Sequence, residues 1–93
     1  MTEMIRRHIT FTGCVQGVGF RYRARHAACL YGCTGWVRNE WDGSVVMEVQ
    51  GNDSAISRML GLINSGSFIR IEDLQQTILP PVEGERGFRV SGY

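Results

Sequence analysis

The sequence contains no lysine, and all ten of its basic residues are arginines. Enzymes that form a Schiff base through lysine, and P-loop NTPases, which bind phosphate with a lysine, are therefore excluded. The ten arginines are balanced by nine acidic residues, which leaves a net charge of +1. Domains that bind nucleic acid usually carry a strongly basic face, so we expect no nucleic-acid partner.

Long apolar runs are also absent. The longest covers residues 27–31, far short of the roughly 18 residues needed to cross a bilayer. The N-terminal residues pass directly into an alternating pattern and show neither the apolar segment nor the small-residue cleavage site of a secretory signal. We therefore expect a cytoplasmic protein with no membrane partner.

Cysteine is scarce. Cys14, Cys29 and Cys33 are the only three, and they form no C-x-x-C pair and no Cys/His cluster with zinc spacing. An odd count without a secretory signal predicts reduced thiols and no metal site. We expect Cys29 and Cys33 to lie in or near the core at the end of a helix. His8 and His26 are isolated in the sequence, which favours surface or partly buried structural positions for both.

The residues that are present are typical of a small globular protein. The 93 residues are 43% apolar and 20% charged, which predicts one domain over residues 1–93. Neither a linker nor an internal repeat divides the chain. Glycine is frequent, at 12 residues, and marks turns or close backbone contacts.

The spacing of apolar residues changes along the chain and predicts five strands and two helices. The strands are expected over 5–12, 34–39, 45–50 and about 69–79, with a short last one at 88–90, and the helices over about 20–31 and 53–63. The glycine-rich run at 13–19 breaks the pattern and is predicted to be a loop.

Individual residues predict how these elements begin, end and bend. Gly32 is placed to end the first helix, and Asp53 to cap the start of the second. Asp42 and Gly43 form the residue pair of a tight turn between the second and third strands. The apolar residues of the fourth strand change parity, which predicts a bulge near residues 72–73.

The element order is β-α-β-β-α-β, followed by a short terminal strand. Two helices can cover only one face of such a sheet. We therefore predict an α+β fold, a ferredoxin-like α/β sandwich with two helices on one face of an antiparallel sheet. The alternation at 5–12 predicts that the first strand has one buried face.

Arginines crowd the start of the first helix, where the helix dipole normally favours acidic side chains. Arg21, Arg23 and Arg25 lie there, and no Asp or Glu occurs from Gly13 to Arg38. A bound anion would stabilise this arrangement, since the glycines before the helix allow several backbone N–H groups to converge on a phosphate-sized group. Arg21 lies nearest the apolar stripe and is predicted to bind two phosphate oxygens, whereas Arg23 and Arg25 are expected to be solvated surface residues.

Three segments of the chain read GCVQGVGFR at 13–21, GWVRN at 35–39 and DGSV at 42–45. In this order they resemble the acylphosphatase family, whose members hydrolyse mixed anhydrides of carboxylic and phosphoric acids, and the similarity covers nearly the whole chain. The resemblance implies that the phosphate-binding arginine is Arg21 and the water-positioning asparagine is Asn39. It also implies a phosphate loop whose backbone N–H groups come from Val15, Gln16, Gly17, Val18, Gly19 and Phe20.

The reaction that this resemblance implies needs few groups. The leaving carboxylate has a conjugate acid with a pKa of about 4, so it departs without a general acid. Arg21 and the loop amides can stabilise charge on the phosphoryl oxygens, so we expect no metal and no cofactor. Asn39 can accept a hydrogen bond from the attacking water and donate one to the phosphate, and the substrate's own phosphate is expected to take the proton.

The residues alone leave the role of Asn39 open. Its parity with Gly35 and Val37 predicts that its side chain lies on the helix-covered face, near the loop. An asparagine close to Asp42 and Gly43 fits a turn-forming role equally well. The family resemblance favours the catalytic interpretation.

We expect a monomeric enzyme whose partner is a small-molecule acyl phosphate. An alternative is a carbamoyl-phosphate-handling or phosphate-binding module related to the N-terminal domain of carbamoyl-transfer maturation proteins. RNA-recognition domains share the same element order, but the strand at 45–50 lacks the aromatic and basic residues with which those domains stack bases.

Overall fold

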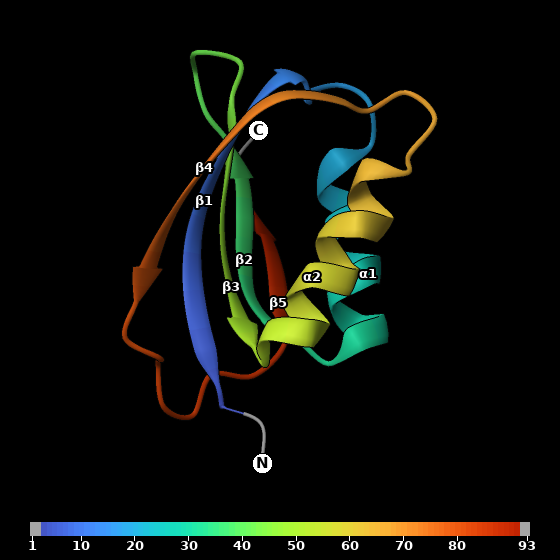
Figure 1. The fold of residues 1–93 in the computed structure, drawn as a ribbon. Helices are drawn as coiled ribbons and strands as arrows, with labels where there is room; N and C mark the ends of the chain where they lie inside the picture. Colours follow the sequence, from blue (N-terminus) through green and yellow to red (C-terminus); the bar gives the residue numbers. More distant parts are fainter. Residues whose placement is uncertain (1–2, 92–93) are drawn as a thin grey trace.

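The computed structural model describes residues 3–91. Along the chain its elements are β1 (Ile5–Cys14), α1 (Phe20–Tyr31), β2 (Thr34–Asn39), β3 (Val45–Gly51), α2 (Asp53–Asn64), β4 (Arg70–Leu79) and β5 (Phe88–Ser91). The strands form one sheet in the order β4-β1-β3-β2-β5, and both helices lie against the same face of it (Figure 1). The predicted ferredoxin-like sandwich is therefore confirmed.

β5 departs from the predicted antiparallel arrangement. The pairs that β1 forms with β3 and β4, and the pair of β2 with β3, are antiparallel, but β5 pairs in parallel with β2, so the sheet is mixed. The chain leaves β4 at the end of the sheet where β2 begins, and it crosses to the far edge before β5 starts (Figure 1). From that end, β5 runs in the same direction as β2.

β1 is two residues longer than predicted, since Gly13 and Cys14 belong to it rather than to the loop. They pair with Ile71 and Arg70 of β4. Gly13 has a φ of 123°, and a Cβ atom there would lie 2.4 Å from the backbone oxygen of Arg70. Close contact between the two strands therefore requires glycine at this position. The sequence pattern does not distinguish such a strand glycine from a glycine in a loop.

β4 contains the predicted bulge. Ile71 and Asp73 face consecutive residues of β1, so Glu72 is an extra residue on β4. The extra residue restores the inward orientation of the strand after the parity change. Ile71 and Leu74 can therefore both pack against the core.

The core lies between the sheet and the two helices. Ala24, Ala27 and Ala28 of α1 are fully buried, and their small side chains let the helix approach the sheet closely. The fully buried residues of α2 are Ile56, Met59 and Ile63. Gly32 ends α1 in the left-handed conformation, at a φ of 70°, as predicted.

The start of α2 corrects one prediction. Asn52, not Asp53, is the cap, because the Asn52 side-chain oxygen accepts a hydrogen bond of 2.8 Å from the N–H of Ala55. Asn52 has the extended backbone that an N-cap requires, with φ −77° and ψ 160°. Asp53 instead begins the helix, where it forms an ion pair with Arg7.

The cysteines and histidines occupy different environments. Cys33 is buried, as predicted, and burial raises the pKa of its thiol. Cys29 is exposed, so its predicted position in or near the core is wrong; it lies on the side of α1 away from the buried alanines. His8 has a structural position, with Nδ1 3.0 Å from Oε2 of Glu48, and His26 is exposed.

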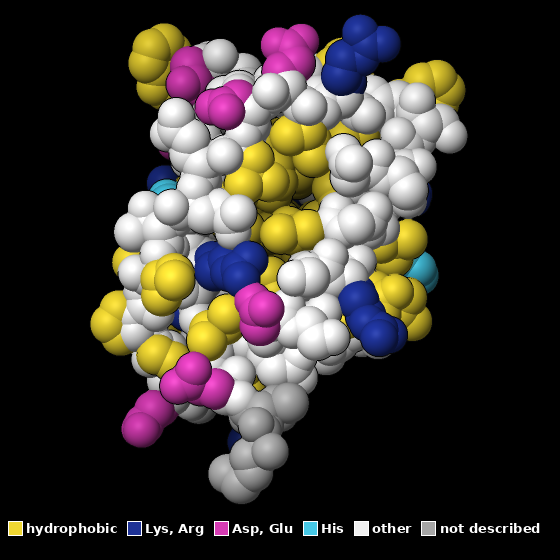
Figure 2. Space-filling view, viewed as in Figure 1, with side chains coloured by type: hydrophobic (Ala, Val, Ile, Leu, Met, Phe, Trp, Pro, Cys, Tyr) yellow, Lys and Arg dark blue, Asp and Glu magenta, His cyan; other side chains and the backbone are white. Residues whose placement is uncertain are grey.

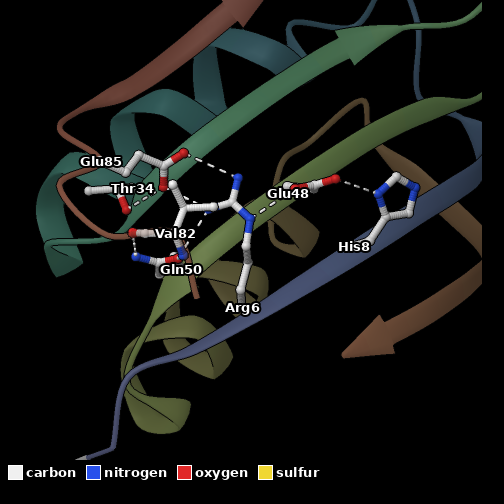
Figure 3. Close-up of polar contacts among 7 residues, drawn as sticks. All are labelled: Arg6, His8, Thr34, Glu48, Gln50, Val82 and Glu85. Carbon is white, nitrogen blue, oxygen red and sulfur yellow. Dashed lines mark hydrogen bonds and ion pairs between the residues drawn. The ribbon is translucent and has the colours of Figure 1, made fainter. Parts of the chain in front are cut away.

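Arg6 lies on the sheet face away from the helices, yet it is only 3% exposed. Its guanidinium donates hydrogen bonds to Oε1 of Glu48 at 2.8 Å, to Oε1 of Gln50 at 3.1 Å and to both carboxylate oxygens of Glu85 at 2.8 and 3.1 Å (Figure 3). Glu85 belongs to the segment 80–87 between β4 and β5. The alternation in β1 predicts one buried face and does not reveal that this segment covers Arg6 on the other.

Further hydrogen bonds hold the same segment against the sheet. Glu85 accepts one from Oγ1 of Thr34 at 2.8 Å. Gln50 exchanges two with the backbone of Val82, at 2.9 and 2.7 Å. We refer to Arg6, Thr34, Glu48, Gln50 and Glu85 as the Arg6 network (Figure 3). Through it, side chains from β1, β2 and β3 fix the chain that leads into β5.

The helices do not cover the sheet as far as its β4 edge. Figure 2 shows apolar side chains in a hollow between β4 and α2. The hollow has a volume of about 350 Å³ and is lined by Phe11, Leu60, Gly61, Asn64, Ile71 and Leu74. The layer of helices is therefore narrower than the sheet.

Candidate active site

Buried apolar side chains hold both ends of the chain between β1 and α1, residues 15–19, which we call the β1–α1 loop. Val15 is 1% exposed, and Phe20, the first residue of α1, is 2% exposed. The ring of Phe20 packs against that of Phe11 in β1, with centroids 4.9 Å apart. Between these fixed ends, Gly17 and Gly19 lie exposed at the surface.

Gly17 and Gly19 give this loop its shape. Their φ angles are 72° and 79°, in the left-handed region that glycine adopts without strain. In the described part of the chain, a Cβ atom at either position would meet nothing within 4 Å, so conformation rather than space requires glycine. Gly19 is the N-cap of α1 and offers no side-chain cap, and the first turn holds no acidic residue. The backbone N–H groups at this helix start are therefore placed to bind an anion.

A pocket of about 180 Å³ opens between this loop and the end of β2. It is lined by Val15, Gly17, Gly19, Phe20, Arg21, Tyr22 and Asn39. Of the predicted site residues, Gln16 and Val18 are not part of the lining. Tyr22, which the sequence pattern does not single out, is. The pocket thus brings Arg21 and Asn39 together, and it is large enough for a phosphate group.

Arg21 is half-buried at the start of α1 and is held by the last strand of the sheet. Its Nη1 donates a hydrogen bond of 2.9 Å to the carbonyl oxygen of Ser91 in β5. A guanidinium has five N–H donors, so this bond orients Arg21 without using up its capacity to bind phosphate oxygens. The contact spans 70 residues of sequence, and no local pattern predicts it.

Arg23 corrects another prediction, because it is not a solvated surface residue. Its Nε donates to the carbonyl oxygen of Leu62 at 2.8 Å, and its Nη2 donates to Oγ of Ser65 at 2.9 Å. These bonds connect α1 to the C-terminal end of α2, where a cation interacts favourably with the last carbonyls. Arg25 is exposed, as predicted.

Asn39 reaches the pocket because the β2–β3 hairpin ends beside the loop. It is half-buried, is the last residue of β2 and pairs with Val45 of β3. The turn that follows is the predicted one, with a φ of 92° at Gly43. Oδ1 of Asp42 accepts hydrogen bonds from the hydroxyl and the N–H of Ser44, at 2.6 and 3.0 Å, and these bonds lower the pKa of Asp42. Asp42 therefore stabilises the turn, while Asn39 faces the pocket.

Gln16 makes a contact that the sequence does not predict. From the sequence we expect only its backbone N–H to act, but its side-chain amide donates to the carbonyl oxygens of Glu40 and Ser44. A glutamine within a glycine-rich loop belongs to no apolar period or turn motif from which this contact could be inferred.

No helix within residues 3–91 is long and apolar enough to span a bilayer. The same residues contain no group of three or more His, Cys, Asp or Glu side chains arranged to hold a metal ion.

Comparison with known proteins gives consistent results. The family model described as Acylphosphatase matches residues 7–90. An acylphosphatase of Bacillus pumilus is 39% identical over 90 residues, which cover 96% of this chain and all of the relative.

Solved structures agree with this family match. The crystal structure of acylphosphatase from Bacillus subtilis superimposes with a TM-score of 0.85 at 31% identity, over 94% of this chain and 98% of that one. The structure of full-length HypF in its phosphate- and nucleotide-bound form matches with a TM-score of 0.82 at 26% identity, but the match covers 99% of this chain and 12% of that one.

Proposed function

This chain belongs to the acylphosphatase family and hydrolyses acyl phosphates, and we propose that its catalytic pocket lies between the β1–α1 loop and the end of β2. In this proposal the phosphoryl group binds to Arg21 and to the backbone N–H groups of residues 15–20. Asn39 orients the water that attacks phosphorus. The products are a carboxylate and inorganic phosphate.

One observation carries this proposal: Arg21 and Asn39, which lie on different elements, line the same small pocket as the β1–α1 loop. Among residues 3–91, the pocket lining includes a cationic side chain and no acidic one. A dianionic phosphoryl group would therefore meet a guanidinium, a helix start and a neutral amide. These are groups that stabilise phosphoryl transfer to water.

The leaving group explains why so few residues suffice. A carboxylate is a weak base, with a conjugate-acid pKa of about 4, so it departs from phosphorus without being protonated. The remaining task is to stabilise the negative charge on the phosphoryl oxygens. Arg21 can bind two of these oxygens, and the loop N–H groups can bind others.

Asn39 would act on the nucleophile. Its side-chain carbonyl can accept a hydrogen bond from water, and its NH2 group can donate one to a phosphoryl oxygen. The water is then held in line with the bond that breaks, which lowers the entropy cost of the reaction. The proton of the attacking water passes to the substrate's own phosphate.

The proposal includes a metal-independent, monomeric enzyme of the cytoplasm. Arg21 and the loop N–H groups supply the positive charge that a metal ion provides in other phosphatases. Arg21, Asn39 and the β1–α1 loop meet at the pocket within one chain, so the proposed mechanism requires no residue of a second copy. The three free thiols are typical of a reducing compartment.

The alternative, a module that handles carbamoyl phosphate or only binds phosphate, is less supported. The match to an acylphosphatase from Bacillus pumilus extends over nearly the full length of both chains, whereas this chain covers 12% of full-length HypF. A pocket that contains both Arg21 and Asn39 is suited to hydrolysis rather than to phosphate binding alone, because Asn39 can orient a water molecule.

Hydrolysis of an aromatic acyl phosphate, measured with a metal chelator present and inorganic phosphate as competitor, tests the proposed function. We expect turnover to be unaffected by the chelator, because Arg21 and the loop carry the charge stabilisation. We expect phosphate to inhibit competitively, because it occupies the same site. Turnover that stops on chelation, or phosphate that does not compete, would contradict the proposal.

Arg21→Ala tests the same site with a substitution. Removing the guanidinium should lower kcat/KM about 1000-fold, by analogy with other arginines that stabilise transferring phosphoryl groups. Arg25→Ala, an exposed arginine on the same helix, is the matched control and should keep wild-type activity. Circular dichroism should show both variants folded, and undiminished turnover in a folded Arg21→Ala would refute the assigned role.

A further inference from the structure

The side chain of Gln16 connects the β1–α1 loop to the turn of the β2–β3 hairpin. Its amide nitrogen, Nε2, donates hydrogen bonds to the carbonyl oxygens of Glu40, at 2.6 Å, and of Ser44, at 2.9 Å. A primary amide carries two N–H donors, so both are used at this one turn. The contact gives the loop a fixed point outside its own strand and helix.

The two oxygens that Gln16 contacts are themselves held in place. The N–H of Glu40 donates to the oxygen of Ser44 at 2.9 Å, and the N–H of Gly43 donates to the oxygen of Glu40 at 3.2 Å. Ser44 is only 5% exposed, and its N–H and hydroxyl both donate to Asp42. Gln16 therefore bonds to a closed and well-supported turn.

This turn is directly connected to Asn39. Asn39 precedes Glu40 in the chain, and its partner on β3, Val45, follows Ser44. The two oxygens that accept from Gln16 thus lie next to the strand pair that carries Asn39. The contact between Gln16 and these oxygens therefore connects the loop to the strand pair that carries Asn39.

We propose that Gln16 is a positioning residue whose side chain sets the distance between the β1–α1 loop and Asn39. This inference rests on the function proposed above and adds to it a role for the side chain of Gln16, a residue that is not part of the pocket lining. The loop binds the phosphoryl group and Asn39 orients the water, so in-line attack requires a fixed separation between them. Gly17 and Gly19 give the loop conformational freedom, which the side chain of Gln16 restricts.

Gln16→Met tests this inference, because methionine has a similar length, lacks the N–H donors and keeps the backbone N–H of residue 16. The oxygens of Glu40 and Ser44 retain their backbone partners, so the variant is expected to fold. We expect kcat for an acyl phosphate to fall about tenfold or more, because the water and phosphorus are no longer aligned. The inhibition constant of inorganic phosphate should change less than about threefold, because the backbone donors remain.

A matched control accounts for lost stability. Asn52→Ala also removes a side-chain hydrogen bond to backbone, at the start of α2 rather than beside the pocket. It should lower the melting temperature while keeping the wild-type kcat. A comparable fall in kcat for Asn52→Ala and Gln16→Met would show that stability alone is responsible, and it would overturn the inference.

A double-substitution cycle tests whether Gln16 acts through Asn39. In an Asn39→Ala background, Gln16→Met should lower kcat no further than about twofold, because the residue that it positions is gone. Losses that multiply would overturn the inference, as would an unchanged kcat in Gln16→Met alone. Full turnover in Asn39→Ala would overturn both this inference and the role of Asn39, whereas a wild-type protein that hydrolyses no acyl phosphate would contradict the proposed function itself.

Discussion

Asn39 provides an uncharged amide at a position where a charge would interfere with the reaction. A carboxylate there would repel the phosphoryl group, and a basic side chain would compete with Arg21 for its oxygens. An amide can instead accept a hydrogen bond from water and donate one to phosphate. Asn39 should therefore contribute to kcat more than to phosphate binding.

Substitution of Asn39 separates these two contributions. Asn39→Ala should lower kcat about 100-fold, because the attacking water loses its orientation, and should change the inhibition constant of phosphate less than about threefold. Asn39→Asp keeps the shape but adds a negative charge, so it should also raise KM and weaken phosphate inhibition. Steady-state kinetics with phosphate as inhibitor measure kcat, KM and the inhibition constant for each variant. If Asn39→Ala weakened phosphate binding more than turnover, Asn39 would be a binding residue.

At the level of elements, the start of α1 places three arginines in three environments. Arg21 lines the pocket, Arg23 bonds to the end of α2, and Arg25 faces solvent. At about 100° per residue along a helix, Arg23 points to a different side from Arg21, whereas Arg25 lies one turn beyond Arg21 on the same side. The cluster therefore combines one phosphate-binding residue with one that connects the two helices.

Arg23→Ala tests this division of roles. Loss of the bonds to Leu62 and Ser65 should lower the free energy of unfolding by about 1 to 2 kcal/mol, as measured by urea denaturation. KM for the acyl phosphate should stay within about twofold of wild type, because Arg23 is directed toward α2. A large rise in KM without a loss of stability would mean that Arg23 binds the substrate.

The elements differ in how far local sequence determines them. Both helices, the hairpin and the bulge near Glu72 could be predicted, because each depends on apolar period or on turn residues within a few positions. The end of β1 at Gly13 and Cys14 could not, because the glycine is explained by the backbone of Arg70 across the sheet. The cap of α2 lies one residue before the predicted one, and the sequence alone does not decide between Asn52 and Asp53 because both are favourable N-cap residues.

At the scale of the whole molecule, the Arg6 network and β5 connect the far end of the sheet to the pocket. The network holds the segment 80–87, which leads into β5, and the last residue of β5, Ser91, accepts the hydrogen bond from Arg21. Burial acts to raise the pKa values of Glu48 and Glu85. Hydrogen bonds outweigh this effect, and both pKa values are lowered. Glu48 accepts these bonds from His8 and Arg6, and Glu85 accepts them from Arg6 and Thr34.

These lowered pKa values predict how stability depends on pH. A carboxyl group whose pKa is lowered by folding stabilises the protein above its unfolded pKa, near 4.5 for glutamate, and this stabilisation is lost as the pH falls through the folded pKa. The free energy of unfolding should therefore decrease below about pH 4.5. Urea denaturation at several pH values measures this decrease.

Glu85→Gln identifies the source of this dependence. The variant should have a free energy of unfolding about 2 kcal/mol lower at pH 7, because Arg6, which is buried, loses a charged hydrogen-bond partner. Its stability should also fall less steeply in acid than that of the wild type. Glu83→Gln, an exposed residue of the same segment, is the control and should follow the wild-type curve. Parallel pH curves for Glu85→Gln and wild type would exclude Glu85 as a contributor.

Contacts between distant segments account for what the sequence did not predict at the scale of the molecule. Arg21 and Asn39 could be selected from local patterns and family resemblance, and the fold brings them to one pocket. The burial of Arg6, the parallel direction of β5 and the side-chain contact of Gln16 depend on segments that the chain brings together only after folding. Periodicity within one element carries no information about them.

The central claim is that a phosphate group binds between the β1–α1 loop, Arg21 and Asn39. Titration of the 15N-labelled protein with inorganic phosphate, followed by NMR, tests it most directly. We expect saturable shifts that are largest for the backbone N–H groups of residues 15–21, with shifts for the Arg21 Nε–H and the Asn39 side-chain amide. Saturable shifts that were largest elsewhere, such as around Arg38 and Arg89 on β2 and β5, or no saturable shifts at all, would contradict the claim.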